Sequence, residues 1–208
     1  MKVTRIEEGL WRWTGRHEEW RQEVGSVYVE TADGVCLVDP LVPTEEPERF
    51  WEALDRDVER AGGGVHVLVT VFWHTRHTAA MVERYGARVW APARGRAPIA
   101  RRAGAVSDPF PPGAALPGGI VPIGTARANE VVYHLPAHRA LVVGDVILGG
   151  KEGGLRFCPA GWLPARIGHP ELAASLEPLR DLDVERVLVS HGEPVLERGA
   201  AAIAALFT

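Results

Sequence analysis

The N-terminal part of the chain alternates between apolar runs and short polar turns, which predicts antiparallel strands. Residues 10–13 alternate apolar and charged side chains, as a half-buried strand does. Residues 24–30 and 35–41 are rich in β-branched side chains, and Ala32-Asp33-Gly34 between them has the composition of a tight turn. We therefore expect a run of strands before the first helix.

Helical periodicity replaces this alternation after residue 44. Thr44 is expected to cap a helix whose first turn contains two glutamates, because acidic side chains are favourable near a helix N-terminus. An apolar residue then recurs every four positions from residue 50 to residue 58, which gives the helix one apolar face. Glycines at residues 62–64 are expected to end the helix.

The stretch that follows carries most of the candidate chemistry. Residues 65–72 form an apolar, β-branched run that predicts a buried strand, and residues 78–85 predict a helix. His74 and His77 lie in the turn between them, where open α/β architectures place their sites. Two histidines at such a turn could converge on one point above the sheet edge. The same spacing is also found in ordinary polar residues at a surface turn.

The alternation of strands and helices continues to the C-terminus. The expected elements are a strand at 87–90, a basic helix at 92–102, a proline-rich loop at 108–119, strands at 120–123, 130–134 and 139–146, a glycine-rich loop at 149–164, a helix at 170–182, a strand at 187–189 and a helix at 200–207. The glycine-rich loop contains Lys151, Phe157 and Trp162, and a loop of that length usually has a function such as covering a pocket. No repeat or linker divides the chain. We therefore expect a single domain over residues 1–208, of the α/β (α+β) class, with two sheets packed face to face and helices outside.

Composition narrows the classes of function. The formal net charge of −4 gives no reason to expect nucleic acid or an anionic membrane as a partner. No apolar run approaches the roughly 20 residues that a transmembrane helix needs, and the first residues lack the apolar core of a signal peptide. Cys36 and Cys158 form no disulfide framework. A cytoplasmic protein that binds a small molecule is expected, and its oligomeric state is left open.

Asp145 and His191 also stand where apolar strands are expected to end. Asp145 follows the run Leu-Val-Val-Gly at residues 141–144, and His191 follows Val-Leu-Val-Ser at residues 187–190. Taken singly, Asp145 could cap a turn and His191 could be an ordinary histidine before a glycine turn. Together with His74 and His77 they are expected to cluster at one sheet edge, where histidine and aspartate form a ligand set that zinc accepts.

Four segments of the chain carry a resemblance to a known family: Val-Cys-Leu-Val-Asp-Pro at 35–40, the strand, turn and helix around His74, Leu-Val-Val-Gly-Asp at 141–145 and Val-Ser-His-Gly at 189–192. They resemble segments of the metallo-β-lactamase-fold superfamily, and the resemblance covers nearly the whole chain. The resemblance implies a four-layer αββα sandwich with a metal site at one sheet edge. The signature of that family reads H-x-H-x-D-H, followed by a mid-chain histidine, a bridging aspartate and a terminal histidine.

This sequence departs from the signature at three ligand positions. Phe72 stands at the place of the first histidine, and Arg76 stands at the place of the aspartate. Ala126 stands at the place of the mid-chain histidine, while His134 lies further along the next strand. The comparison with the signature therefore implies that the dinuclear site is absent.

What remains of the signature implies at most one ion. One subsite keeps only His74, and the other keeps His77, Asp145 and His191, which with a water are enough for a catalytic zinc. One divalent metal, with zinc preferred, and no metal at all both stay open, because the Arg76 guanidinium would repel a cation. Arg76 is expected to fold inward and pair with Asp145.

The leading functional hypothesis is a diverged hydrolase that acts on a small ester, thioester, lactone or amide. With a metal, Asp145 would orient the attacking hydroxide. Without one, His191 or His77 would be the general base and Arg76 would stabilise the oxyanion. The alternatives are a non-catalytic member of the fold, which binds a ligand or partner in the old cleft, and a cyclase or isomerase that reuses the arginine and histidine pocket.

Overall fold

The computed structural model describes residues 1–104, 106–150 and 154–208. Its strands are β1 (Lys2–Glu7), β2 (Leu10–His17), β3 (Gln22–Thr31), β4 (Gly34–Val38), β5 (Gly64–Leu68), β6 (Arg88–Pro92), β7 (Asp108–Phe110), β8 (Val121–Gly124), β9 (Val131–Leu135), β10 (Ala140–Val143), β11 (Ile147–Gly149), β12 (Leu155–Phe157) and β13 (Arg186–Val189). Its α-helices are α1 (Pro47–Ala61), α2 (Thr78–Tyr85), α3 (Arg96–Ala103), α4 (His169–Leu176) and α5 (Gly199–Ala205). Among the short 3-10 helices are η1 (Phe72–Thr75) and η7 (Glu177–Asp181).

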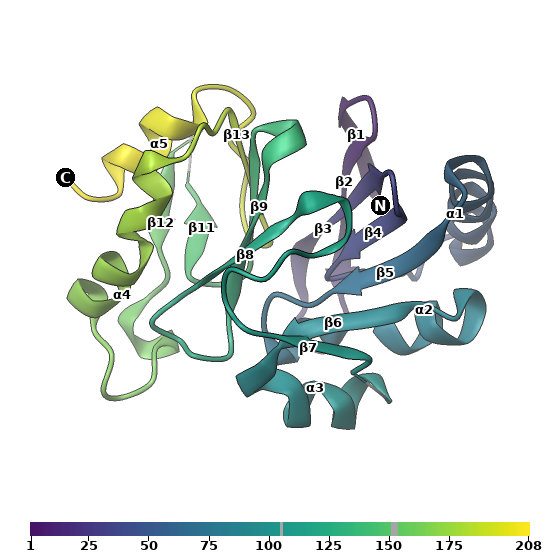
Figure 1. Cartoon of the computed structure of the whole chain (residues 1–208), viewed down its shortest axis with the longest axis horizontal. Helices are drawn as coiled ribbons and strands as arrows, with labels where there is room; N and C mark the ends of the chain where they lie inside the picture. The colour runs from purple at the N-terminus through teal and green to yellow at the C-terminus, as the bar shows by residue number, and fades with distance from the viewer. Residues whose placement is uncertain (105, 151–153) are drawn as a thin grey trace.

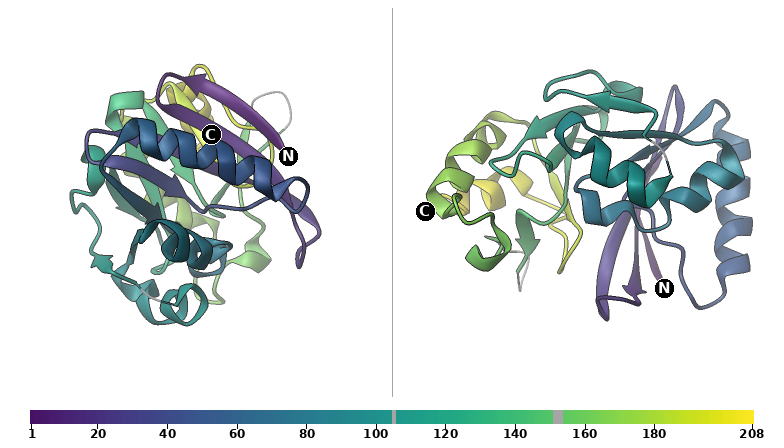
Figure 2. Two further views of the ribbon diagram at one scale, coloured as in Figure 1. Left: turned by 90° about the vertical axis from the view of Figure 1, so that its right-hand side faces the viewer. Right: turned by 90° about the horizontal axis from the view of Figure 1, so that it is seen from below.

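Two sheets face each other at the centre of the molecule, with helices on both outer sides (Figure 1). The larger sheet has seven strands in the order β1 to β7, and the smaller has four in the order β13-β10-β9-β8. Helices α1, α2 and α3 cover the larger sheet, and α4 and α5 lie beyond the smaller one, as the further views also show (Figure 2). This αββα sandwich confirms the expected fold class.

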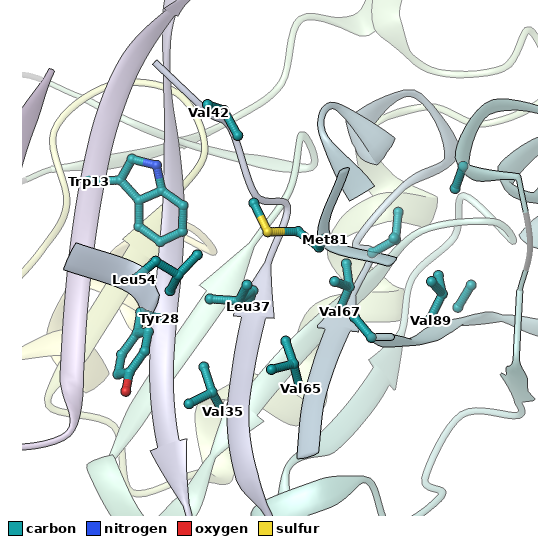
Figure 3. Close-up of a cluster of buried hydrophobic side chains, with 14 of the residues drawn as sticks. Trp13, Tyr28, Val35, Leu37, Val42, Leu54, Val65, Val67, Met81 and Val89 are labelled. Carbon is teal, nitrogen blue, oxygen red and sulfur yellow. The ribbon is translucent and has the colours of Figure 1, made fainter. Parts of the chain in front are cut away.

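Strand β4 shows how alternation divides the interior into two cores. Val35 and Leu37 belong to the core under the helices, where they lie near Leu54 of α1 (Figure 3). Cys36 and Val38 belong to the core between the two sheets. All four β4 side chains are at most 1% exposed. Burying a valine or leucine side chain contributes roughly 1.5–3 kcal/mol, so the strand is fixed in place from both sides.

Parallel pairing brings the carboxyl ends of four strands to one edge of the sandwich. Strand β4 is parallel to β5 in the larger sheet, and β10 is parallel to β13 in the smaller sheet. Next to these ends the sheets touch, because the Gly25 N–H donates to the Ser190 carbonyl at 2.7 Å. A Cβ at Gly25 would lie 2.8 Å from the Val189 carbonyl oxygen, so this approach requires glycine.

Helix α1 begins later than expected and has no side-chain cap. It starts at Pro47 after Glu46, whose φ is 51°, so the prediction that Thr44 caps it is wrong. The residue before a proline disfavours the right-handed helical region, and proline itself suits the first helical turn. Pro47 therefore sets the start of the helix. Gly62 ends it, as predicted.

The central strand is shorter than its apolar run, because the chain turns to the second sheet before the run ends. Strand β5 ends at Leu68 rather than at residue 72. The Val69 carbonyl accepts from the Tyr133 hydroxyl at 2.8 Å, and the Thr70 carbonyl accepts from the Val131 N–H at 3.0 Å.

Three further expectations need correction. The expected loop at 108–119 contains β7, an edge strand in which Pro109 is tolerated because one of its sides needs no donor. The expected helix at 170–182 divides into α4 and η7, because Pro178 interrupts the α-helical hydrogen bonds. The expected loop at 149–164 contains β12, and its Lys151 lies outside the described residues. No helix in the described part of the chain has the length and apolar character that crossing a membrane requires.

Candidate metal centre

Three of the four residues singled out in the sequence meet at the edge where the parallel strands end. His74 follows β5, Asp145 follows β10 and His191 follows β13. One potential ligand atom from each lies within 4.8 Å of the others, and the described residues contain no second such group. Because the three residues come from both sheets, their meeting depends on the face-to-face packing.

The contacts of this cluster converge on one oxygen, Asp145 Oδ1. The Nε2 atoms of His74 and His191 each lie 3.1 Å from it. Neither His74 Nε2 nor Asp145 Oδ1 makes a directed hydrogen bond, although both atoms are buried. A buried polar atom without a partner is costly, so these atoms need a shared proton or a shared cation.

The opposite side of the His74 ring is held by Asp39, which directly follows β4. Asp39 Oδ2 lies 3.0 Å from His74 Nδ1 and accepts from the Thr70 hydroxyl at 2.5 Å. Asp39 Oδ1 accepts from the Thr70 N–H at 2.9 Å. An anionic acceptor at Nδ1 assigns the ring proton to that atom and leaves the Nε2 lone pair facing the cluster. Carboxylates orient many metal-ligating histidines in this way.

The second oxygen of Asp145 is engaged by an indole. Trp73 Nε1 donates to Asp145 Oδ2 at 2.5 Å. The backbone at this point is held by Glu130, whose Oε1 accepts from the N–H groups of Asp145 and Val146 at 2.6 and 2.8 Å. Asp145 is therefore fixed so that Oδ1 alone faces the two histidines.

Arg127 supplies a permanent positive charge on the indole side. Its side chain is 3% exposed, and its guanidinium pairs with Glu130 at 2.8 Å and lies 3.9 Å from Asp145 Oδ2. The guanidinium also lies over the Trp73 ring, with 4.9 Å between Cζ and the ring centroid. Because a guanidinium stays charged at any relevant pH, Asp145 always has a cationic neighbour.

These neighbours set the protonation states of the cluster. Burial raises the pKa of Asp145, but His74 and His191 outweigh it and hold that pKa well below its usual value. Burial lowers the pKa of His74, but the contacts with Asp145 and Asp39 together outweigh burial and raise the pKa overall. Burial and the Asp145 charge raise the pKa of Glu130 to about 7. An ionised Asp145 thus lies beside a His74 that favours a positive charge at Nε2, which a proton or a metal ion can supply.

His77 does not join the cluster. Its Nδ1 accepts from the Val42 N–H at 3.1 Å, and the residue directly precedes helix α2. The backbone at Arg76 has φ 39°, a left-handed turn that separates the directions of His74 and His77. The strand ends predicted that all four residues meet, and the family signature grouped His77 with Asp145 and His191, whereas the structure groups His74 with them.

Arg76 points inward, as expected, but the expected ion pair with Asp145 does not form. Its Nη1 donates to the carbonyls of Gly25 at 2.6 Å and Asp39 at 2.8 Å, and its Nη2 donates to the Ser190 hydroxyl at 2.5 Å. Burial lowers the pKa of Arg76 to about 10, which leaves it protonated at neutral pH. The guanidinium therefore links the ends of β4 and β13 to β3.

The described residues contain one group of donors that could hold a divalent ion. Two imidazole nitrogens and one carboxylate oxygen converge, and zinc accepts three protein ligands with water at the fourth position. The Trp73 N–H and the Arg127 guanidinium lie on the far side of Asp145. Both are hydrogen-bond donors and offer no lone pair to a metal ion. The described residues thus offer one ligand set, formed by His74, Asp145 and His191.

The sequence matches no family model and no curated protein. Solved structures, in contrast, match over nearly the whole chain. A beta-lactamase domain protein from Burkholderia ambifaria has a TM-score of 0.67 at 20% identity, over 99% of this chain and 75% of that chain. A metallo-beta-lactamase from Pontibacter korlensis has a TM-score of 0.67 at 17% identity, over 98% of each chain. A metallo-beta-lactamase family protein from Thermus thermophilus has a TM-score of 0.62 at 19% identity, over 97% of this chain and 80% of that one. The chain has the metallo-β-lactamase fold.

In this metallo-β-lactamase fold, aromatic and cationic side chains lie near the places where the signature would supply ligands. Phe72 packs edge-on against Trp73, with ring centroids 4.5 Å apart. Arg127 directly follows Ala126, the residue aligned with the mid-chain histidine, and reaches the Asp145 carboxylate. An indole and a guanidinium thus lie beside the second oxygen of Asp145.

Sequence reasoning missed four residues of the site: Asp39, Trp73, Arg127 and Glu130. Asp39 carried a usable signal, because it ends an apolar strand in the same way as Asp145. Arg127 and Glu130 lie in a short polar segment without periodicity, and only the packing of β9 against the end of β5 brings them to the site.

Gly144→Ala is expected to destabilise the protein by about 1–3 kcal/mol, the usual cost of overpacking a filled interior. A Cβ at this position would lie 2.7 Å from Thr70 Oγ1 and 3.0 Å from Glu130 Oε1, and hydrogen bonds hold both atoms in place. Urea unfolding measures the change, with Gly161→Ala as the control because open space surrounds Gly161. Equal losses in the two variants would contradict the packing described here.

Asp39→Asn is expected to weaken zinc binding about 10- to 100-fold, the usual effect of losing a carboxylate that orients a metal-ligating histidine. The amide cannot hold the proton on His74 Nδ1 as firmly as the carboxylate does. Calorimetric titration with zinc measures the affinity, and Asp181→Asn, at an exposed position, is the control. An unchanged affinity would show that Asp39 does not orient the ring.

Proposed function

We propose that this protein is a hydrolase of small esters, thioesters, lactones or amides that uses at most one divalent metal ion, preferably zinc. The observation that carries the proposal is the convergence of two histidine nitrogens on Asp145 Oδ1 without directed hydrogen bonds. A cleft of about 340 Å³ opens onto Asp145 and His191, which is room for a small molecule.

A zinc ion held by His74, Asp145 and His191 would polarise a carbonyl group and increase the acidity of water. The side chains have separate tasks around it. Asp145 Oδ1 accepts a hydrogen bond from the attacking water and orients it. His191, which is 11% exposed at the cleft, would use the Nε2 lone pair to hold the ion; without zinc, the same nitrogen can take the proton of the attacking water as a general base. Arg127 and the Trp73 N–H hold the Asp145 carboxylate in one orientation.

Arg76 has a positioning role in this proposal rather than the catalytic role expected from the sequence. Its Nη1 and Nη2 atoms donate to Gly25, Asp39 and Ser190, so the end of the guanidinium is directed at these groups and not at the cleft. The guanidinium instead keeps Asp39 and the end of β13 at fixed positions, and these in turn place His74 and His191.

A non-catalytic binding protein is the second candidate. The observation that favours it is the pairing of Asp145 Oδ2 with the Trp73 N–H and its closeness to Arg127, which stabilise the carboxylate without any metal. Such a protein would bind a ligand in the same cleft and would show no turnover.

Protein purified without chelator is expected to contain up to one zinc per chain by elemental analysis, and zinc added after dialysis should raise the melting temperature. His191→Ala should abolish that shift and any hydrolysis of a panel of esters, thioesters, lactones and amides. His169→Ala, at an exposed histidine outside the cluster, is the control. Two tightly bound ions per chain would contradict the single site, and a cleft that binds ligands without turnover would favour the second candidate.

A further inference from the structure

Three tryptophans line the cleft that opens onto His191. Trp20 comes from the turn between β2 and β3, Trp73 from η1, and Trp162 from the segment before α4. Single exposed apolar side chains are common on protein surfaces, but three indoles from separate segments give this one cleft an aromatic lining, which we call the aromatic wall. Trp162 is 43% exposed, so the wall has a surface on which a ligand can pack.

These rings are held beside the reactive side chains. Trp20 stacks on His17, with centroids 4.1 Å apart and planes 12° apart, and its centroid lies 5.8 Å from that of His74. The Trp162 ring meets the His191 ring edge to face at 6.1 Å. The indole of Trp73 is fixed by its bond to Asp145. A group that packs on this wall is therefore in contact with the cluster as well.

The same cleft has one cation at its rim. Arg102, in α3, is exposed, its Cζ lies 5.7 Å from the Phe72 ring centroid, and no carboxylate of the described residues forms an ion pair with it. Glu19 also lines the cleft, but it comes from the turn between β2 and β3 and not from α3, and no ion pair joins it to Arg102. A free guanidinium fork is the side chain that best recognises a carboxylate.

We propose that the substrate carries a flat aromatic group, which packs against Trp20 and Trp162, and a carboxylate, which pairs with Arg102. The bond to be hydrolysed then lies between them, at Asp145 and His191. This deepens the proposed function and rests on it for the hydrolysis, whereas the recognition of an aromatic carboxylate stands on the cleft alone.

The test is a calorimetric titration of the full-length protein with three probes that contain no bond to hydrolyse: 2-naphthoate, 2-naphthamide and decalin-2-carboxylate. 2-Naphthoate is expected to bind about 3- to 10-fold more tightly than the saturated carboxylate, the usual gain of an aromatic pair. It is expected to bind about 10-fold more tightly than the amide, the usual gain of a charge-assisted contact.

Matched variants separate the two contacts. Trp162→Leu should remove most of the aromatic preference, and Trp162→Phe should keep it. Arg102→Gln should remove the carboxylate preference, and Arg101→Gln, at the neighbouring exposed arginine, should keep it. A carboxylate preference that survives Arg102→Gln would place the carboxylate on the metal and overturn the role of Arg102. Equal binding of the aromatic and saturated probes would overturn the aromatic wall.

Failure of this inference differs from failure of the proposed function. Tight, ring-selective binding without hydrolysis of any aryl ester or amide would overturn the hydrolase and leave the recognition intact. Hydrolysis of small aliphatic esters at the same rate as aryl esters, without ring-selective binding, would overturn the recognition and leave the hydrolase intact.

Discussion

Asp145→Asn is expected to weaken zinc binding by more than about 100-fold and to reduce hydrolysis to the background rate. The loss should exceed that of a residue that only orients a ligand, which is about 10- to 100-fold. Both histidine nitrogens lie 3.1 Å from the same Asp145 oxygen, so its negative charge is the common point of the cluster. A neutral amide carries no such charge, and its NH₂ group could face the histidines instead.

Calorimetric zinc titration and the ester panel measure this effect, with Asp181→Asn as the exposed control. Circular dichroism and urea unfolding show whether the variant keeps its fold. A folded Asp145→Asn protein with zinc affinity near that of the parent would remove Asp145 from the ligand set. Zinc affinity that is lost while hydrolysis persists would instead point to catalysis by His191 without metal.

Arg76→Met is expected to lower the free energy of unfolding by about 3–5 kcal/mol, because it leaves several buried acceptors without their charged donor. Those acceptors are the carbonyls of Gly25 and Asp39 and the Ser190 hydroxyl, which belong to three segments of the chain. Arg76→Lys should recover part of the loss, since an ammonium reaches fewer of them at once. Urea unfolding measures all three proteins, with Arg101→Met as the exposed control.

Arg76→Asp restores the residue of the family signature, yet it is expected to destabilise the protein rather than create a second metal site. A carboxylate at this position would face the same carbonyl oxygens, which are acceptors and cannot donate to it. Elemental analysis should find no second ion. A stable Arg76→Asp protein with two ions per chain would show that the guanidinium only blocks an otherwise intact site.

Local patterns predicted most of the fold, because the spacing of apolar residues along an element follows from which of its faces are buried. Helix α2 occupies the predicted residues, and β4 has the alternation that two facing cores require. The errors arose where a neighbour in space decided the outcome. Strand β5 stops early because the backbone at Val69 and Thr70 bonds to the second sheet, which no property of residues 65–72 reveals.

The site was predictable to the level of strand ends and not to the level of side-chain direction. A polar residue after an apolar strand placed His74, Asp145 and His191 at one edge, as expected. Whether His74 or His77 points into the cluster depends on the positive φ of Arg76, and sequence patterns do not show backbone angles. The approach of Arg127 and Glu130 depends on the pairing of Glu130 with Val71, a contact between distant segments. That residues 1–208 form a single domain stays a prediction.

The contact between Gly25 and Ser190 makes one amide a reporter of how the sandwich opens. Strand β4 ends opposite Val27, so the Gly25 N–H lies beyond the neighbouring strand and bonds to the Ser190 carbonyl of the other sheet at 2.7 Å. Amides inside a sheet exchange their hydrogen with solvent when strands separate from one another. The Gly25 amide exchanges when the two sheets separate at the edge that carries His74, Asp145 and His191. Its exchange rate therefore measures how often the site opens.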